Sequence, residues 1–409
     1  MAFSIKIDTN GGVTSPKGFQ ANGIHCGIRK NKDKKDLMLI LSETECDAAA
    51  VYTKNLVYGA PITVTRKNLE NGKARAVICN SGIANTCNAD GVEKAQAMCD
   101  LAAEYTGVSA DDVIVGSTGV IGQPIDLEPI QNGMQALADG LSANGSDAAA
   151  EAIMTTDTVE KQAAVEFTVG GKVCHIGGIA KGSGMIHPDM ATMLVFITTD
   201  AAVSSEMLQK ALSSDIQSTF NMVSVDGDTS TNDMVVVMAN GMAENAEITA
   251  EGEDFSEFMK ALNSVTVRLC RMIAGDGEGA TKLLECCVSS ASDEKTAKTV
   301  AKSVICSSLF KAAMFGADAN WGRVLCAIGY SKADVDVNKI DVGLSSLKGE
   351  IAVCKNGRGI DFSEEKAKEI LLEKEITVNI ALNSGEAEAT AWGCDLTYDY
   401  VKINGDYRT

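Results

Sequence analysis

The apolar run Met-Leu-Val-Phe-Ile at residues 193–197 places the strongest constraint on the fold of this chain. An uninterrupted run of this length is typical of a strand that is covered on both faces. The segment before it contains Gly182, Gly184 and Pro188, which favour turns and extended backbone. We therefore expect a central strand inside a layered structure, with a loop that ends where this strand begins.

Strand and helix patterns alternate along the rest of the chain. Hairpin signals interrupt this alternation, so the pattern favours α+β layers over a doubly wound parallel sheet. The clearest predictions are strands at residues 74–79, 376–382, 387–392 and 396–403, helices at residues 90–106, 254–273 and 292–310, and a hairpin turn at Gly170-Gly171.

Length and charge narrow the class of protein. A chain of 409 residues with 45% hydrophobic content predicts a globular enzyme with two domains or two tightly joined layers. The formal net charge of -19 argues against nucleic acid and anionic membranes as partners. The N-terminus has no basic segment followed by an apolar core, so we expect a cytoplasmic protein.

The thirteen cysteines do not form a recognisable metal or disulfide pattern. They are scattered through apolar segments, and no C-x-x-C pair occurs. Without a cysteine or histidine cluster at zinc spacing, we expect reduced thiols that lie mostly in the core, and no metal site.

Thr192 stands where the glycine-containing loop meets the apolar strand. If the Ala191-Thr192 bond were cut, Thr192 would carry both a hydroxyl nucleophile and a free α-amino group. An α-amine titrates near ~7.7 to 8.0, which suits a general base. The chain has only three histidines and no Gly-x-Ser-x-Gly motif, so a hydrolase triad has little support. The local pattern alone also fits an ordinary threonine at the start of a strand.

Other polar segments each allow a functional and a structural interpretation. Residues 116–119, Gly-Ser-Thr-Gly, form either an oxyanion site or a turn after a strand. The glycine-rich residues 275–279 expose Glu278 to a cleft, and no phosphate-loop lysine follows them. Lys181 either neutralises a substrate carboxylate or is solvated. Residues 226–233 fit a hydrogen-bonded loop better than a calcium loop.

Motifs spread almost from end to end resemble the ornithine acetyltransferase, or bifunctional glutamate N-acetyltransferase, family of arginine biosynthesis. The matching segments are residues 80–85, 117–119, 154–157, 181–182, 190–193, 226–233, 320–323, 392–397 and 404–409. Two positions depart from the family pattern. Ala319 stands where proline is frequent, and His187 stands where small or apolar residues are frequent. Neither departure falls on a residue matched to the chemistry.

The resemblance implies a fold and a maturation step. It implies a layered α/β sandwich of the self-processing N-terminal-nucleophile-like aminopeptidase type. Cleavage between Ala191 and Thr192 would give an α chain, residues 1–191, and a β chain, residues 192–409. The two chains would share one core, with a C-terminal α+β region at about residues 290–409. Family members commonly form α2β2 heterotetramers.

The resemblance also implies an activity. Thr192 would take the acetyl group of N2-acetyl-L-ornithine and pass it to L-glutamate, without a cofactor. Thr118 and Gly119 match the oxyanion residues. The positions matched to substrate binding are Thr155, Thr156, Lys181, Thr192, Glu278, Asn404 and Thr409. Three alternatives stay open: additional use of acetyl-CoA as acetyl donor, an N-terminal-nucleophile aminopeptidase or amidase, and a non-catalytic assembly protein.

Overall fold

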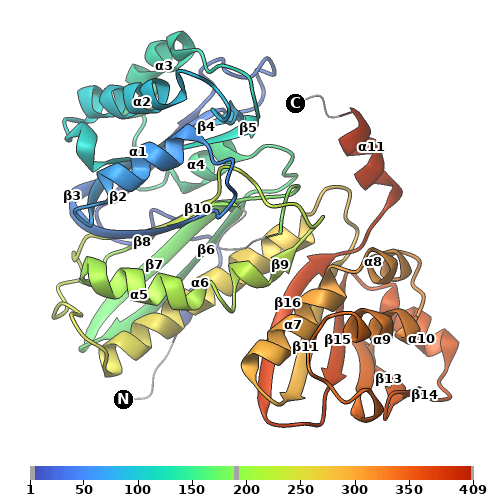
Figure 1. Ribbon diagram of the computed structural model, residues 1–409. Coiled ribbons are helices and arrows are strands. Elements are labelled where there is room, and N and C mark those ends of the chain that lie inside the picture. Colours follow the sequence, from blue (N-terminus) through green and yellow to red (C-terminus); the bar gives the residue numbers. More distant parts are fainter. Residues whose placement is uncertain (1–4, 188–192, 407–409) are drawn as a thin grey trace.

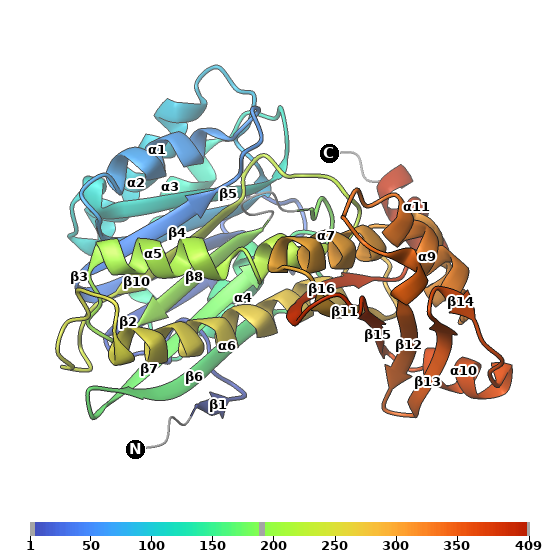
Figure 2. The same cartoon turned by 60° about the horizontal axis from the view of Figure 1, so that its bottom comes forward.

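The computed structural model describes residues 5–187 and 193–406. It consists of a large layered body, formed mainly by the first two thirds of the chain, and a smaller C-terminal part beside it (Figure 1). Each part is built on its own sheet. Both views place helix α11, near the C-terminus, at the upper end of the smaller part (Figures 1 and 2).

Nine strands of the described residues form the larger sheet, in the order β1-β6-β7-β8-β10-β3-β4-β5, with β2 paired to β3. Their bounds are β1 Lys6–Asp8, β2 Phe19–Ile24, β3 Leu37–Tyr52, β4 Lys73–Ile83, β5 Val113–Val120, β6 Lys161–Val169, β7 Lys172–Lys181, β8 Leu194–Thr199 and β10 Met234–Ala239. Two of the pairings, β8 with β10 and β4 with β5, are parallel, and the others are antiparallel.

Strand β3 joins two layers of this sheet. Its first part, from Leu37, pairs with β2 and β4, whereas residues 47–52 pair with β10, and the register shifts between Leu41 and Cys46. Such an irregularity bends a strand. The side chain of Phe196 on β8 reaches Gly116 on β5, where an added Cβ would lie 3.3 Å from the ring. The β2–β5 layer therefore packs across the layer of β7, β8 and β10.

Helices cover the outer faces of both layers (Figure 1). Helices α1 Ala60–Asn68, α2 Gly91–Thr106 and α3 Leu127–Asp139 pack on the first layer, and α5 Ser205–Asp215 and α6 Glu253–Gly275 pack on the second. Helix α4 Ser146–Ile153 contributes to the core between the layers. The predicted α+β class and layered sandwich are confirmed.

Strand β8 confirms the prediction made from the apolar run. Leu194 and Phe196 belong to the core between the two layers, while Val195 and Ile197 belong to the core beneath α5 and α6. All six residues of the strand are buried. The central strand is therefore covered on both faces, as an uninterrupted apolar sequence requires.

The seven-stranded sheet has the order β14-β13-β12-β15-β11-β16-β9. Its strands are β9 Val223–Ser224, β11 Leu283–Ala291, β12 Asp341–Ser346, β13 Gly349–Lys355, β14 Arg358–Gly359, β15 Glu375–Ala381 and β16 Ala387–Cys394, with helices α7 Glu294–Ile305, α8 Ser308–Phe315, α9 Trp321–Gly329, α10 Glu364–Leu371 and α11 Tyr398–Asp406. Strand β9 precedes α6 in the chain, so a short segment of the middle region completes the C-terminal sheet. The domain boundaries drawn from the sequence stay predictions.

Local signals were reliable where glycine decides the backbone. Gly170 and Gly171 have φ of 54° and 77° in the β6–β7 hairpin, and Gly107 ends α2 with a φ of 73°.

The thirteen cysteines are all free, and most are buried. The long helix predicted at residues 292–310 is instead two helices, α7 and α8, because Ser307 accepts the N–H of Phe310 and caps a second start.

The strand predicted at residues 396–403 is wrong, since this segment forms α11. Its apolar residues do not face a core: Tyr398 is 84% exposed and Val401 is 69% exposed. The Thr397 hydroxyl accepts the Tyr400 N–H at 3.4 Å near the start of the helix. A helix satisfies its backbone hydrogen bonds internally, which an unpaired strand at this position does not.

Candidate active site

A cavity of about 300 Å³ is lined by residues from the two layers of the large body and by Asn404 of helix α11. Segments that are far apart in the sequence supply its walls. The lining residues are Ala84, Thr118, Gly119, Ile121, Thr155, Thr156, Lys181, Gly184, Met185, Ser230, Thr231, Asn232, Glu278 and Asn404. A concave site with a few convergent polar groups is the usual form of a small-molecule site.

Thr118 and Gly119 lie near the end of β5. The sequence allowed either an oxyanion site or a turn at residues 116–119. The turn is wrong, since the strand continues to Val120 and pairs with β4, with Gly82 opposite Gly119. Gly119 has a φ of 128°, and a Cβ there would lie 2.3 Å from the carbonyl carbon of Gly82. Only glycine fits this position. The Thr118 hydroxyl makes no hydrogen bond within the described residues, so it is available to a ligand in the cavity.

Thr155 and Thr156 follow α4 and both line the cavity, so the geometry does not choose between them. The backbone N–H of Thr155 donates to Asp157 Oδ2 at 2.9 Å. Asp157 is only 3% exposed. The short loop is therefore anchored from beneath by a buried carboxylate.

An ion cluster of Asp157, Lys161 and Asp276 lies beneath the cavity. Lys161 is fully buried, and its Nζ is 2.7 Å from Asp157 Oδ1 and 2.5 Å from Asp276 Oδ2. Burial by itself raises the pKa of Asp157, but the charges of Lys161 and Lys181 outweigh it and hold that pKa well below its usual range. Asp157 is therefore a carboxylate at neutral pH.

Lys181 and Glu278 supply opposite charges to the cavity. Lys181 ends β7 and pairs with Leu194 at the start of β8. Glu278, only 8% exposed, follows α6, and its backbone N–H donates to the Ser183 carbonyl at 3.0 Å. A Cβ on Gly184 would lie 2.4 Å from the carboxyl carbon of Glu278. Gly184 therefore allows the carboxylate to lie against the loop that leads toward residue 188.

Helix α11 brings Asn404 to the same cavity, where its Nδ2 donates to Glu278 Oε2 at 2.7 Å. Thr397, just before the helix, donates to the Gly279 carbonyl at 2.6 Å. Burial, followed by the negative charges of Asp226 and Glu278, raises the pKa of Tyr400, so its phenol stays protonated. Polar contacts of the loops with α11 thus place a surface helix beside the site.

A model of the ArgJ family matches residues 20–409. The chain belongs to the ArgJ family. The family resemblance inferred from the motifs is confirmed.

Two curated relatives match this ArgJ-family chain over nearly their whole length. The arginine biosynthesis bifunctional protein ArgJ of Caldanaerobacter subterraneus subsp. tengcongensis is 51% identical over 98% of this chain and 99% of its own. The protein of the same name from Bacillus subtilis is 49% identical over 98% of each chain. A solved structure of ornithine acetyltransferase complexed with ornithine, from Mycobacterium tuberculosis, is 35% identical and covers 46% of this chain and 100% of that chain, with a TM-score of 0.43.

Seven of the residues predicted to serve catalysis or substrate binding in this ArgJ-family chain line the cavity described above. They are Thr118, Gly119, Thr155, Thr156, Lys181, Glu278 and Asn404. Their individual roles stay predictions. Three further predicted residues, Ala191, Thr192 and Thr409, lie outside the described residues.

The sequence missed part of the cavity wall. Ser230, Thr231 and Asn232 line the cavity, although residues 226–233 were interpreted only as a hydrogen-bonded loop. They do form such a loop: Asn232 Nδ2 donates to the Ser117 carbonyl at 2.9 Å, next to Thr118. The run of hydroxyl and amide side chains between two buried strands was the available signal.

Two other motifs lie away from the cavity. His187 Nδ1 is 3.1 Å from Ser224 Oγ and 3.5 Å from Cys306 Sγ, and His187 is absent from the cavity lining. Asn320 caps α9 in the C-terminal part, where its side chain accepts the Arg323 N–H. Within the described ranges, no three histidine, cysteine or acidic residues are grouped to hold a metal ion, and no helix there is long and apolar enough to cross a membrane.

Proposed function

We propose that this chain cleaves itself between Ala191 and Thr192 and then transfers the acetyl group of N2-acetyl-L-ornithine to L-glutamate. The observation that carries the proposal is the convergence of Thr118, Gly119, Lys181 and other predicted site residues on one cavity. The segments on both sides of residues 188–192 adjoin this cavity, since Met185 lines it and Lys181 pairs with Leu194. Membership of the ArgJ family, with relatives named for arginine biosynthesis, supports the same activity.

The reaction proceeds in two acetyl transfers. The Thr192 hydroxyl attacks the acetyl carbonyl while the Thr192 α-amine takes the hydroxyl proton. The Thr118 hydroxyl and the Gly119 N–H stabilise the oxyanion. The C–N bond then breaks, and ornithine leaves with the proton on its amine. The amine of glutamate then attacks the carbonyl of acetyl-Thr192, the ester C–O bond breaks, and the Thr192 α-amine passes a proton from the glutamate amine to Thr192 Oγ. This step gives N-acetyl-L-glutamate and regenerates the enzyme.

Charge decides how the amino acids are held. Donor and acceptor share an α-carboxylate, which we assign to Lys181 with the segment 404–409 that contains Asn404 and Thr409. We assign Glu278 to an amino group of the substrate. Thr155 and Thr156 then contact the substrate from the opposite wall. No cofactor takes part in this chemistry.

The proposed assembly and location follow from the family. We propose that residues 1–191 and 192–409 stay together after cleavage and pair into an α2β2 heterotetramer in the cytoplasm. The net charge of -19 agrees with small amino acids as partners rather than nucleic acid.

Denaturing electrophoresis combined with a transfer assay tests the proposal. Wild-type protein should give fragments of residues 1–191 and 192–409 and should form acetylglutamate from acetylornithine and glutamate. Thr192→Ala should stay one chain and lose about 10⁴-fold to 10⁶-fold in activity, as expected when a nucleophile is removed. Thr192→Ser keeps a hydroxyl and serves as the matched control. An uncut wild-type chain with full transfer activity would refute the role of Thr192.

A second activity, acetylation of glutamate from acetyl-CoA, is favoured by the word bifunctional in the names of both curated relatives. Omitting acetylornithine and supplying acetyl-CoA separates the two reactions. The competing hydrolase interpretation predicts free acetate regardless of glutamate. Under our proposal, added glutamate diverts the acetyl group to acetylglutamate.

A further inference from the structure

Asp157 connects two walls of the cavity through its two carboxylate oxygens. Oδ2 accepts the backbone N–H of Thr155 at 2.9 Å, and Oδ1 accepts the backbone N–H of Gly182 at 2.8 Å. Gly182 directly follows Lys181. A single buried carboxylate therefore connects the threonine loop, which follows α4, to the end of β7, where Lys181 lies.

Asp276, the second aspartate of the cluster, links the segment that carries Glu278 to the other two segments. Asp276 Oδ2 accepts the backbone N–H of Thr158 at 3.0 Å as well as the Lys161 ammonium group. The Ser183 hydroxyl donates to the Asp276 carbonyl at 2.7 Å. Asp276 lies two residues before Glu278. The cluster thus joins all three segments that carry Thr155, Lys181 and Glu278.

The charges in the cluster do not balance. Two buried aspartates face one lysine, Lys161, so the cluster keeps one net negative charge. Lys181 is the next cation that acts on Asp157, and it forms no ion pair within the described residues. The excess negative charge beneath the cavity therefore lies next to the Lys181 ammonium group, whose side chain has no ion-pair partner in the part of the chain described.

We propose that Asp157 is a positioning residue for acetyl transfer, because it aligns Lys181 with the Thr155–Thr156 loop and keeps the lysine ready for the substrate carboxylate. The inference rests on the proposed function, since it assumes amino-acid substrates with an α-carboxylate. It adds a residue that contacts no substrate and acts through Lys181.

Asp157→Asn is the informative variant. It removes one negative charge and leaves Lys161 paired with Asp276, so no buried charge loses its partner. We expect KM for acetylornithine and for glutamate to rise together by about 10-fold, while kcat changes less than threefold. In a Lys181→Ala background, where KM is already raised, Asp157→Asn should add less than threefold. This non-additivity is the mark of one residue acting through another.

Asp200→Asn is the matched control. Asp200 is also fully buried and also accepts backbone N–H groups from two segments, those of Lys17 and His175, but it is absent from the cavity lining and its contacts. It should lower the temperature of unfolding without changing KM. The proposal is overturned if Asp157→Asn leaves both KM values unchanged, or changes them no more than Asp200→Asn does, or adds fully to Lys181→Ala. Failure of the wild-type protein to make acetylglutamate would instead refute the proposed function.

Discussion

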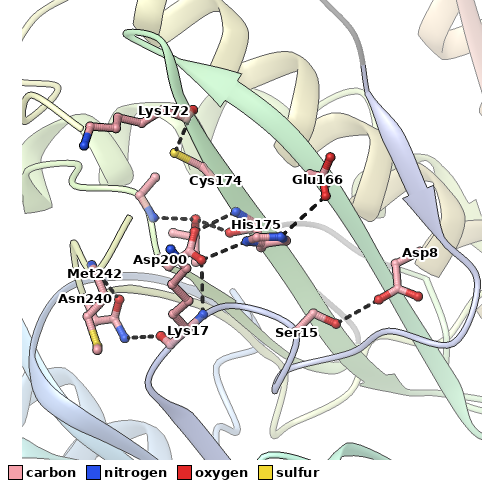
Figure 3. Close-up of polar contacts among 12 residues, drawn as sticks. Asp8, Ser15, Lys17, Glu166, Lys172, Cys174, His175, Asp200, Asn240 and Met242 are labelled. Carbon is pink, nitrogen blue, oxygen red and sulfur yellow. Dashed lines mark hydrogen bonds and ion pairs between the residues drawn. The ribbon is translucent and has the colours of Figure 1, made fainter. Parts of the chain in front are cut away.

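Strand β7 carries His175 near its start and Lys181 at its end, and a buried aspartate accepts a backbone N–H at or beside each of these residues. Near its start, His175 Nδ1 is 2.9 Å from Asp200 Oδ2, and the His175 N–H donates to Asp200 Oδ1 at 2.6 Å (Figure 3). At its other end, Lys181 is followed by Gly182, whose N–H donates to Asp157. Both aspartates join segments that are separated in the sequence: Asp200 accepts the N–H of Lys17, and Asp157 connects its own loop to Gly182.

The surroundings make the two ends different. Asp200 lies beneath His175, which is partly exposed and also lies 3.8 Å from Glu166 (Figure 3). Asp157 lies beneath the cavity and forms a buried cluster with Asp276 and Lys161. A buried aspartate that accepts backbone N–H groups therefore stabilises the fold near His175. Near Lys181, a buried aspartate also places charged groups around the cavity.

The largest expected effect comes from removing the lysine at the cavity end. Lys161→Met leaves Asp157 and Asp276 buried without their cation, so we expect a loss of about 3–5 kcal/mol in the free energy of unfolding. Urea unfolding measures this loss. Lys282→Met, at a buried lysine that donates to the Met314 carbonyl, should cost only about 1–3 kcal/mol. Equal losses would mean that the cluster is an ordinary buried contact.

Thr118→Val should separate chemistry from stability at the cavity end. The substitution removes the proposed oxyanion donor but keeps the shape of the side chain, so kcat should fall about 10²-fold to 10³-fold. The Thr118 hydroxyl makes no hydrogen bond within the described residues, so the unfolding temperature should change little. Ser15→Ala, which removes the contact with Asp8 near His175, should leave kcat unchanged. A large loss of stability in Thr118→Val would contradict this separation.

The smallest effect is a pH dependence at the other end. The hydrogen bond to Asp200 raises the pKa of His175, while burial and the charge of Lys17 act against it, and Asp200 and Glu166 add negative charge. A raised folded pKa means that protonated His175 stabilises the fold fully below the unfolded pKa of about 6.5 and that this stabilisation is lost as pH rises through the folded value. The free energy of unfolding should therefore fall above about pH 6.5, relative to His175→Gln.

The measurement is a series of urea titrations between about pH 5.5 and 8.5 on the wild type and His175→Gln. The difference between the two proteins should shrink as the pH rises. Parallel curves for the wild type and His175→Gln would refute the role of His175.

Sequence patterns predicted the elements whose backbone or burial is dictated locally. The run at 193–197 predicted a strand covered on both faces, and Gly170-Gly171 predicted the hairpin, because positive φ at both positions favours glycine. The strand predicted at residues 396–403 was wrong, because the apolar residues of this segment, which suggested a strand, lie exposed on helix α11. Only the tertiary contacts of residues 396–403 decide between a helix and a strand there.

The candidate site divides in the same way. The motifs indicated Thr118, Lys181 and Glu278 as site residues, and the family resemblance implied a role for each of them without knowledge of the folded structure. They did not indicate Asp157 as an anchor or Asn232 as part of the wall, because these depend on contacts with Gly182 and Ser117 that are distant in the sequence.

The sequence by itself determined the layered class, the glycine-dependent turns, the family and the residue types available for acetyl transfer. These follow from local periodicity, backbone sterics and chain-wide motifs. The tertiary structure alone decided that β5, β7, the loop after α6 and helix α11 converge on one cavity, and that Asp157 and Asp276 share Lys161 beneath it. Burial and charge pairing act between residues that only the folded chain brings together.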